Sequence, residues 1–378
     1  MDERGLLYQE LRSHLLDRSF LRAAKLDRKH IMSILQSQGE PMAEELSQAL
    51  KEYPAPAMGH NESSGALKRF DTRDIVSIAK KFVPELRDEP AEGWVYHCFK
   101  GLLHQLYPHM EQPEDWEERS AGRFLVLQIM RAAFSWERKV LPFDPTREMD
   151  LLSDQEVTAG GFTPEYIHMH KLIRSRYVHE FARIGIDITP FNTLGHIGGV
   201  HYVAMHMARQ LYKAGVPVDL ALMSGAAATH DVGKYGCRSW EARRVPYLHY
   251  YYSSECLRSF GLNKIEHIAA NHSTWDLELE NLSVESLLLI YSDFRTKSDR
   301  NSDNQEVVHF YSLKDAFQVI LNKLDNVDQA KENRYRKVYA KLKDFEDYMV
   351  ELGADPELPE DLREVKDPEI HTVKREMA

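Results

Sequence analysis

Four histidines and two aspartates in the second half of the sequence have the side chains and the spacing of a metal-binding site. The central pair is His230-Asp231, which ends an alanine-rich stretch and is followed by Gly233 and Lys234. An imidazole and a carboxylate at one helix end can both reach metal ions, and a lysine one turn further can reach a bound anion. The other candidate ligands are His196, His249, His272 and Asp293.

Each candidate ligand also has an ordinary interpretation, as a core histidine bonded to a carbonyl or an aspartate capping a neighbouring helix. Together they favour metal binding, because a buried carboxylate or imidazolium costs several kcal/mol unless it is paired or metal-bound. Ligation by histidine and carboxylate suits iron, manganese or zinc rather than calcium. Six ligands suit two metals with Asp231 as the bridge, and metals about 3.5–4 Å apart can activate a hydroxide for in-line displacement. We therefore predict two divalent ions, iron or manganese first, with zinc, magnesium, nickel and cobalt as alternatives.

The apolar pattern places these ligands on the inward faces of successive helices. His196 shares a helix face with Val200 and Leu211, at the spacing of a 3.6-residue period. Asp293 follows Ile290, which puts a carboxylate on an otherwise buried face. The predicted helices cover about 164–184, about 195–213, Pro217 to the His-Asp pair, a segment capped by Asn263 ahead of His272, and Ser283 through Asp293.

A local excess of positive charge separates Asp231 from His249 in a chain of net charge −11. Between these ligands, Glu241 is the one acidic residue, so the segment can hold a phosphate-rich substrate over the metals. The alternative is a solvated basic loop. Aromatic residues in the same segment could stack a base or pack in the core. The predicted substrate-binding residues are Lys234, Arg238, Arg243, Arg244 and Arg295.

The order of the ligands resembles the H…HD…D pattern of the HD superfamily of metal-dependent phosphohydrolases, carried here by His196, His230, Asp231 and Asp293. Residues 196–200 and 207–211 are similar to the family's first ligand helix, and 229–234 to its HD-x-G-K signature. The resemblance covers about 164–310. It implies an all-helical fold, a divalent metal site, a catalytic Asp231 that orients the nucleophile, and a phosphate contact for Lys234.

The extra histidines resemble those of dinuclear HD branches. One is His249, ahead of a helix, and the other is His272, in the segment Asn271-His272-Ser273-Thr274. They are similar to the additional ligands of the bacterial family that hydrolyses symmetrical dinucleoside polyphosphates, in which an H-T-T segment carries the second additional ligand. The cyclic-di-GMP phosphodiesterase branch is also similar, but its H-H-E and G-Y-P segments are absent. Asn192 stands where a third metal would require a glutamate, so a third metal is not expected.

The whole chain reads as all-α, with a helical-bundle metal domain between other helical segments. We expect an N-terminal helical segment at 1–52 broken around Gln38–Pro41, a linker at 53–65, and a helical domain of unknown role at 66–150. The HD domain is expected at 164–310, followed by C-terminal helices at 311–353 that pack on it and a charged tail at 354–378.

Composition limits the compartments and the partners that can be expected for the protein. Its 43% hydrophobic and 28% charged content is ordinary for a globular chain, and no apolar run could span a bilayer. Cys98, Cys237 and Cys256 have no framework spacing, which favours a reducing, cytoplasmic compartment. The acidic balance argues against coating by nucleic acid. The expected partner is a phosphorylated small molecule, in particular a nucleotide.

Two other functions fit the same residues. HD-type di-iron oxygenases, including inositol oxygenase-like enzymes, resemble this chain in having four histidines and two aspartates. A third possibility is a non-enzymatic module that senses a ligand, regulated by residues 1–163, which carry no catalytic constellation. The substrate, the metal and the oligomeric state are left open by the sequence.

Overall fold

The computed structural model is α-helical with five short strands among the residues that it describes, so the predicted fold class is confirmed. No helix in this part of the chain combines the length and apolar content needed to cross a membrane. The described residues are 2–54, 57–58, 66–83, 86–87, 90–111, 120–149, 151–152, 164–189, 194–274, 276–278, 282–300, 306–323 and 328–358.

The chain divides into two compact units. Unit 1 comprises Met1–Ala55, Ser64–Phe143 and Ile173–Thr189, and unit 2 comprises Pro56–Ser63, Asp144–Leu172 and Pro190–Ala378. Residues 173–189, which we had assigned to the metal domain, therefore group with the N-terminal helices. All candidate ligands lie in unit 2.

Unit 1 is a helical unit with a two-stranded antiparallel hairpin, β1 with β3, where the sequence had predicted a linker and then a helix. The predicted helix break around Gln38–Pro41 is wrong, because α3 continues through Pro41. The chain turns earlier instead, where Lys25 adopts a φ of 52°. The elements are α1 (Glu3–Leu15), α2 (Arg18–Ala23), α3 (Arg28–Gln48), β1 (Leu50–Pro54), β3 (Ala66–Phe70), α4 (Thr72–Phe82), α5 (Ala91–Leu106), α6 (Ser120–Val140) and α9 (Val178–Ile188).

Buried ion pairs join the helices of unit 1. Arg183 Nη2 lies 3.0 Å from Glu137 Oε2, and Arg131 Nε lies 2.7 Å from Glu180 Oε1. Tyr177, with a φ of 55°, divides the helix predicted over 164–184 into α8 (Pro164–Ser175) and α9. The two ion pairs hold the helices of unit 1 together. Among the described residues, no group of side chains that could hold a metal ion lies in this unit.

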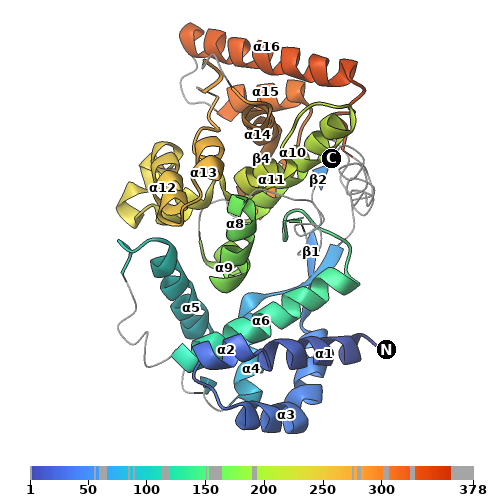
Figure 1. Ribbon diagram of the computed structural model, residues 1–378, viewed down its shortest axis with the longest axis vertical. Helices are drawn as coiled ribbons and strands as arrows, with labels where there is room; N and C mark the ends of the chain where they lie inside the picture. Colours follow the sequence, from blue (N-terminus) through green and yellow to red (C-terminus); the bar gives the residue numbers. More distant parts are fainter. Residues whose placement is uncertain are drawn as a thin grey trace. The chain divides into compact units, whose positions relative to one another are not determined.

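Unit 2 is built around α10, which packs against α11 and α14 (Figure 1). The helix ends differ from the prediction in two places. Asp219 rather than Pro217 begins α11, since its carboxylate accepts hydrogen bonds from the first-turn amides. Asn263 does not cap α13; Glu165 Oε1 accepts from Ile265 N, 3.0 Å away, instead. Ser283 caps α14 as predicted.

The helices and strands of unit 2 other than α8 have the following residue ranges. They are β2 (Ala57–Met58), α10 (Leu194–Lys213), α11 (Leu220–Thr229), the 3-10 helices η2 (Val232–Gly236), η3 (Ser239–Arg244) and η4 (Asp276–Glu278), α12 (Val245–Ser259), α13 (Asn263–Ala269), α14 (Val284–Arg295), β4 (Thr296–Arg300), β5 (Glu306–Phe310), α15 (Leu313–Lys323) and α16 (Gln329–Glu351).

A small sheet of order β2-β5-β4 covers part of α10, and the sequence had not predicted it. Strand β5 pairs antiparallel with β4 and parallel with β2. A Cβ atom at Gly199 would lie 3.0 Å from side-chain atoms of Thr296 and Val308. The glycine therefore lets the ligand helix approach the sheet closely.

The C-terminal helix α16 carries an apolar stripe. Val338, Leu342, Phe345 and Met349 are buried. Gly353 follows with a φ of 88°, the left-handed conformation in which a glycine commonly closes a helix. The last twenty residues of the predicted tail, 359–378, lie outside the described residues.

Candidate metal centre

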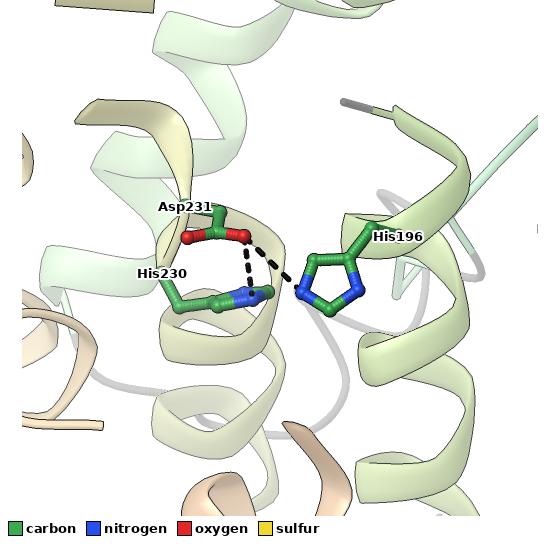
Figure 2. A group of neighbouring side chains, drawn as sticks. All are labelled: His196, His230 and Asp231. Atoms are coloured by element: carbon green, nitrogen blue, oxygen red, sulfur yellow. Dashed lines mark ion pairs between the residues drawn. The ribbon is translucent and has the colours of Figure 1, made fainter. Parts of the chain in front are cut away.

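The structure brings the six predicted ligands together from successive elements of unit 2. Figure 2 shows His196, from α10, pointing toward His230 and Asp231, which follow the last turn of α11. His249 comes from α12, His272 follows α13, and Asp293 lies on α14. Two other histidines of α10 are bound elsewhere: His201 to Ser224 Oγ and His206 to the carbonyl of Asp355.

The two carboxylate oxygens of Asp231 face different pairs of histidines. Oδ2 lies 3.2 Å from Nε2 of His196 and 3.5 Å from Nε2 of His230. Oδ1 lies 3.4 Å from Nε2 of His249 and 3.8 Å from Nε2 of His272. The ligand atoms thus form two groups, His196-His230-Asp231 and Asp231-His249-His272, that share one carboxylate.

Asp293 borders the first of these groups through His196. Its Oδ1 lies 3.1 Å from His196 Nε2, and its side chain keeps 26% exposure while those of His196 and Asp231 keep 8% and 2%. Asp293 is therefore the most exposed of these three side chains.

Backbone carbonyls fix the orientation of three ligand imidazoles. Nδ1 of His230 lies 2.8 Å from the carbonyl oxygen of Ala227, that of His249 2.7 Å from Val245 O, and that of His272 2.6 Å from Ala269 O. A carbonyl oxygen can only accept, so Nδ1 carries the proton in each ring. Each Nε2 then presents a lone pair to Asp231, as ligands held by such outer-shell bonds do in metal sites.

Burial keeps these rings uncharged. It lowers the pKa of His249 to about 4, and burial together with the neighbouring His230 lowers the pKa of His272 to about 4. Burial also lowers the pKa of His230, against the opposing effect of Asp231. Neutral imidazole is the form that binds a metal ion.

The ligand atoms are arranged favourably for binding a cation and unfavourably in its absence. An imidazole lone pair and a carboxylate oxygen are both acceptors, so facing each other at these distances they repel unless a positive ion lies between them. Nε2 of His230 is buried and has no hydrogen-bond partner among the described atoms. Metal bonds of about 2.0–2.2 Å to nitrogen and oxygen set neighbouring ligand atoms roughly 3.0–3.5 Å apart, which is close to the observed separations.

Lys234 is placed at the centre. Its ammonium forms an ion pair with Asp231 Oδ2, the oxygen that also faces His196 and His230. Burial alone would raise the pKa of the Asp231 carboxyl, but Lys234 and the surrounding histidines outweigh burial and hold it well below its usual value. Asp231 is therefore a carboxylate at neutral pH.

Lys297 is a second cation near the centre. Its Nζ donates to the backbone oxygen of Asp293, 2.8 Å away. Burial alone would raise the pKa of the Asp293 carboxyl, but Lys297 and His196 outweigh burial and lower it. Both aspartates are thus ionised ligands.

Gly233 allows the His-Asp turn to lie against the helix of His249. A Cβ atom at Gly233 would meet the carbonyl oxygen of His249 at 1.9 Å and the amide nitrogen of Ser253 at 2.4 Å. Ser253 joins the two segments, since its Oγ accepts from Gly233 N and donates to the carbonyl of His230, both at 2.9 Å. The glycine of the predicted signature therefore serves close packing of two ligand-bearing segments.

Gly233→Ala is expected to separate His249 from the other ligands. Movement of a flexible side chain cannot relieve the clash of the added methyl group, because the two nearest atoms belong to the backbone. We expect loss of metal from the Asp231-His249-His272 group and a fall in stability of about 2–4 kcal/mol, as for an overpacked core. Metal analysis and thermal unfolding would measure both. Gly261→Ala is the control for metal content: nothing lies within 4 Å of its added Cβ, although its φ of 73° makes alanine strained there as well. Equal metal content in the two variants would contradict this role.

Glu306 supports the ligand helix and was missed by the sequence reading. It is buried, and its Oε1 and Oε2 accept from the amides of His196 and Gly195 at 3.0 and 3.2 Å. A negative charge at the first turn of a helix satisfies free amides and complements the helix dipole. A Cβ at Gly195 would lie 2.8 Å from the Glu306 carboxyl carbon, so this glycine makes room for the carboxylate.

Glu306→Ala is expected to loosen His196 because it leaves the two amides of the first turn unpaired. We expect metal affinity to fall about 10–100-fold, the usual effect of losing an outer-shell partner. Glu306→Gln keeps one acceptor, so its affinity for Mn²⁺ in titrations should lie between those of wild type and Glu306→Ala. Glu285→Ala is the control: it removes a buried carboxylate that accepts from Asp219 N at 2.7 Å, at the end of α11 remote from His230. Equal affinities in both alanine variants would refute a specific role for Glu306.

The predicted substrate-binding arginines do not all face the centre. Arg295 is buried, and it donates to the carbonyls of Tyr311 and Pro356 and to Tyr291 Oη. It therefore ties α14 to the following segments, and we remove it from the substrate-binding set. Its proximity to Asp293 in sequence was misleading, because α14 ends at Arg295 and the side chain turns away. Arg238, Arg243 and Arg244 lie at or on η3, and the last two are exposed.

Tyr250 packs beside two of the candidate ligands, His249 and His272. Its ring centroid lies 3.9 Å from that of His249 and 4.8 Å from that of His272. Burial and the nearby carboxylates raise the pKa of its phenol above the usual value, despite a hydrogen bond with Ser273. The phenol is therefore a neutral hydrogen-bond donor beside the centre.

Comparisons of the chain with protein-family models, curated proteins and solved structures found no match. Membership of the HD superfamily therefore stays a prediction, resting on the residue pattern of His196, His230, Asp231 and Asp293. The chemical argument for the centre rests on the described ligands themselves.

Proposed function

We propose that the protein is a metal-dependent phosphohydrolase that uses two divalent ions to hydrolyse a phosphoester or phosphoanhydride bond, in a nucleotide. The observation that carries the proposal is the division of Asp231: each of its carboxylate oxygens faces a separate pair of imidazoles. Backbone carbonyls orient three of these four rings, those of His230, His249 and His272. A carboxylate shared in this way is what a dinuclear centre requires.

The ligands divide between two ions. His196, His230, Asp293 and Asp231 Oδ2 would hold one ion, and His249, His272 and Asp231 Oδ1 the other. When bound, such ions supply a nucleophilic hydroxide at neutral pH and neutralise charge on the phosphoryl oxygens. Histidine and carboxylate ligation favours iron or manganese, with zinc, magnesium, nickel and cobalt as alternatives.

Lys234 and Tyr250 are the groups of this chain that would contact the phosphoryl oxygens. The Lys234 ammonium pairs with Asp231 Oδ2 and would bind an anionic substrate when that oxygen holds a metal ion. The Lys234 side chain keeps 18% exposure, against 2% for Asp231. The resemblance of 229–234 to the HD-x-G-K signature supports the same assignment.

Hydrolysis of bis(p-nitrophenyl) phosphate and of a nucleotide panel, with protein loaded with Mn²⁺ or Fe²⁺, tests the proposal. We expect metal-dependent release of p-nitrophenol that a chelator stops and added metal restores. Absence of hydrolysis from all substrates in protein that holds two metals would refute it. Oxygen consumption accompanied by a mixed-valent iron signal would instead establish the oxygenase alternative.

A further inference from the structure

Three large aromatic side chains are exposed within one short segment of unit 2. Trp240 is 77% exposed, Tyr247 75% and Tyr251 63%, whereas Trp136 is fully buried. Large aromatic groups usually bury most of their surface, and exposed clusters of them mark places where a partner binds. All three lie on η3 and α12, shown in yellow at the margin of unit 2 in Figure 1.

Two of these aromatic side chains share one face of α12. Tyr247 and Tyr251 are four residues apart on this helix, and Arg244 immediately precedes it. His249 lies on the opposite face and is buried among the ligands. We define the aromatic–arginine strip as Arg238, Trp240, Arg243, Arg244, Tyr247 and Tyr251.

The outward charge of the strip is positive. Arg243 and Arg244 are exposed, and neither forms an ion pair with the described residues. Glu241, the one acidic residue between 232 and 254, is used inward: it accepts from Arg238 N at 2.8 Å and from Tyr252 Oη at 3.0 Å. The Arg238 guanidinium lies 5.3 Å from the centre of the Trp240 ring, as a stacked cation does. Two exposed arginines and the half-buried Arg238 therefore lie in this segment of a chain whose net charge is −11.

Alternating aromatic faces and guanidinium groups match one ligand chemistry in particular. Bases of single-stranded nucleic acid stack on exposed aromatic rings, while arginine forks bind the phosphates between them. We propose that the aromatic–arginine strip binds a single-stranded oligonucleotide, and that such a strand is the substrate whose phosphodiester reaches the metal centre; the second half rests on the proposed function. The acidic balance of the whole chain excludes general coating and leaves this local surface.

The position of the strip sets the length of its ligand. A helix with its side chains is about 10–12 Å across, and the strip and His249 lie on opposite faces of α12. A strand that occupies both the strip and the centre must therefore extend past a dinucleotide. Longer strands should bind and react better until the strip is filled.

Binding is tested first without chemistry, using fluorescein-labelled oligothymidylate of twelve nucleotides and Asp231→Asn protein. We expect Trp240→Ala and Tyr247→Ala each to weaken binding about tenfold, since stacking contributes about 1–3 kcal/mol per base. Arg243→Glu should reduce the slope of log affinity against log salt by about one. Tyr96→Ala, Tyr348→Ala and Arg22→Glu, on exposed residues elsewhere, should have no effect.

The hydrolysis test uses active protein and oligothymidylates of two, six and twelve nucleotides. We expect KM to fall with length in wild type and in Tyr96→Ala, and to depend much less on length in Trp240→Ala. Equal binding by strip and control variants would overturn the proposal. So would dissociation of an oligomer by Trp240→Ala in sedimentation, because a second copy would then cover the strip.

The two proposals fail in distinguishable ways. If bis(p-nitrophenyl) phosphate is hydrolysed but oligothymidylate does not bind, the strip proposal is wrong and the phosphohydrolase stands. If oligothymidylate binds through the strip but no phosphodiester is hydrolysed by metal-loaded protein, the proposed function and the substrate half of this proposal are wrong. The strip is then a binding surface alone.

Discussion

Asp231→Asn is expected to empty both metal sites and to abolish hydrolysis. The substitution removes the one negative charge that faces all four histidines and leaves Lys234 without its ion-pair partner. Lewis-acid metals contribute several kcal/mol to transition-state stabilisation, so their loss corresponds to a fall in kcat of about 10³-fold or more at 1.36 kcal/mol per tenfold. Metal analysis and steady-state kinetics on the same preparation measure both effects.

The control for Asp231→Asn is Asp344→Asn, which changes the same charge at an exposed position of α16. It should retain metal and activity. Circular dichroism should show that the Asp231 variant keeps its helical content. Full metal content in folded Asp231→Asn protein would contradict the bridging role.

The second large effect is the separate loss of each metal. His230→Asn and His272→Asn each remove Nε2 while keeping a donor for the carbonyl that now binds Nδ1. Because the two rings face different oxygens of Asp231, each variant should lose one ion and retain the other. We expect hydrolysis to fall about 10²–10³-fold in each case, since two-metal displacement needs both ions.

Native mass spectrometry of these variants distinguishes two sites from one. The expected result is one metal per chain in each, with a combined His230→Asn/His272→Asn variant holding none. His267→Ala, at an exposed position on α13, is the control and should hold two. Complete loss of metal in either single variant would indicate one shared site and refute the division of Asp231.

The clustering of the six candidate ligands could be predicted from sequence because each lies on, or just after, a helix whose inward face is marked by apolar periodicity. Leu289, Ile290 and Val200 are fully buried or nearly so, and the helices that carry them point Asp293 and His196 toward the same centre. The Ala-rich stretch before His230-Asp231 folds as the expected helix, with His230 at its end. Periodicity locates such residues without any knowledge of the tertiary contacts.

Residues that act through tertiary contacts were not accessible in the same way. Glu306 lies on a strand that is distant in sequence from His196, and nothing in its neighbourhood signals a helix partner. The short strands β4 and β5 carry polar residues, so they lack a strong alternating pattern, although β5 alternates in burial. Arg295 was misplaced because sequence proximity to a ligand does not fix the direction of a side chain at a helix end.

The metal content of the wild-type chain tests the central claim most directly. Protein purified without chelator, or loaded with Mn²⁺ or Fe²⁺ and freed of excess, is analysed for metal per chain by inductively coupled plasma mass spectrometry. The bridged arrangement of Asp231 predicts two ions per chain in wild type and none in Asp231→Asn. One ion per chain, or binding that Asp231→Asn leaves unchanged, would contradict a centre built on that carboxylate.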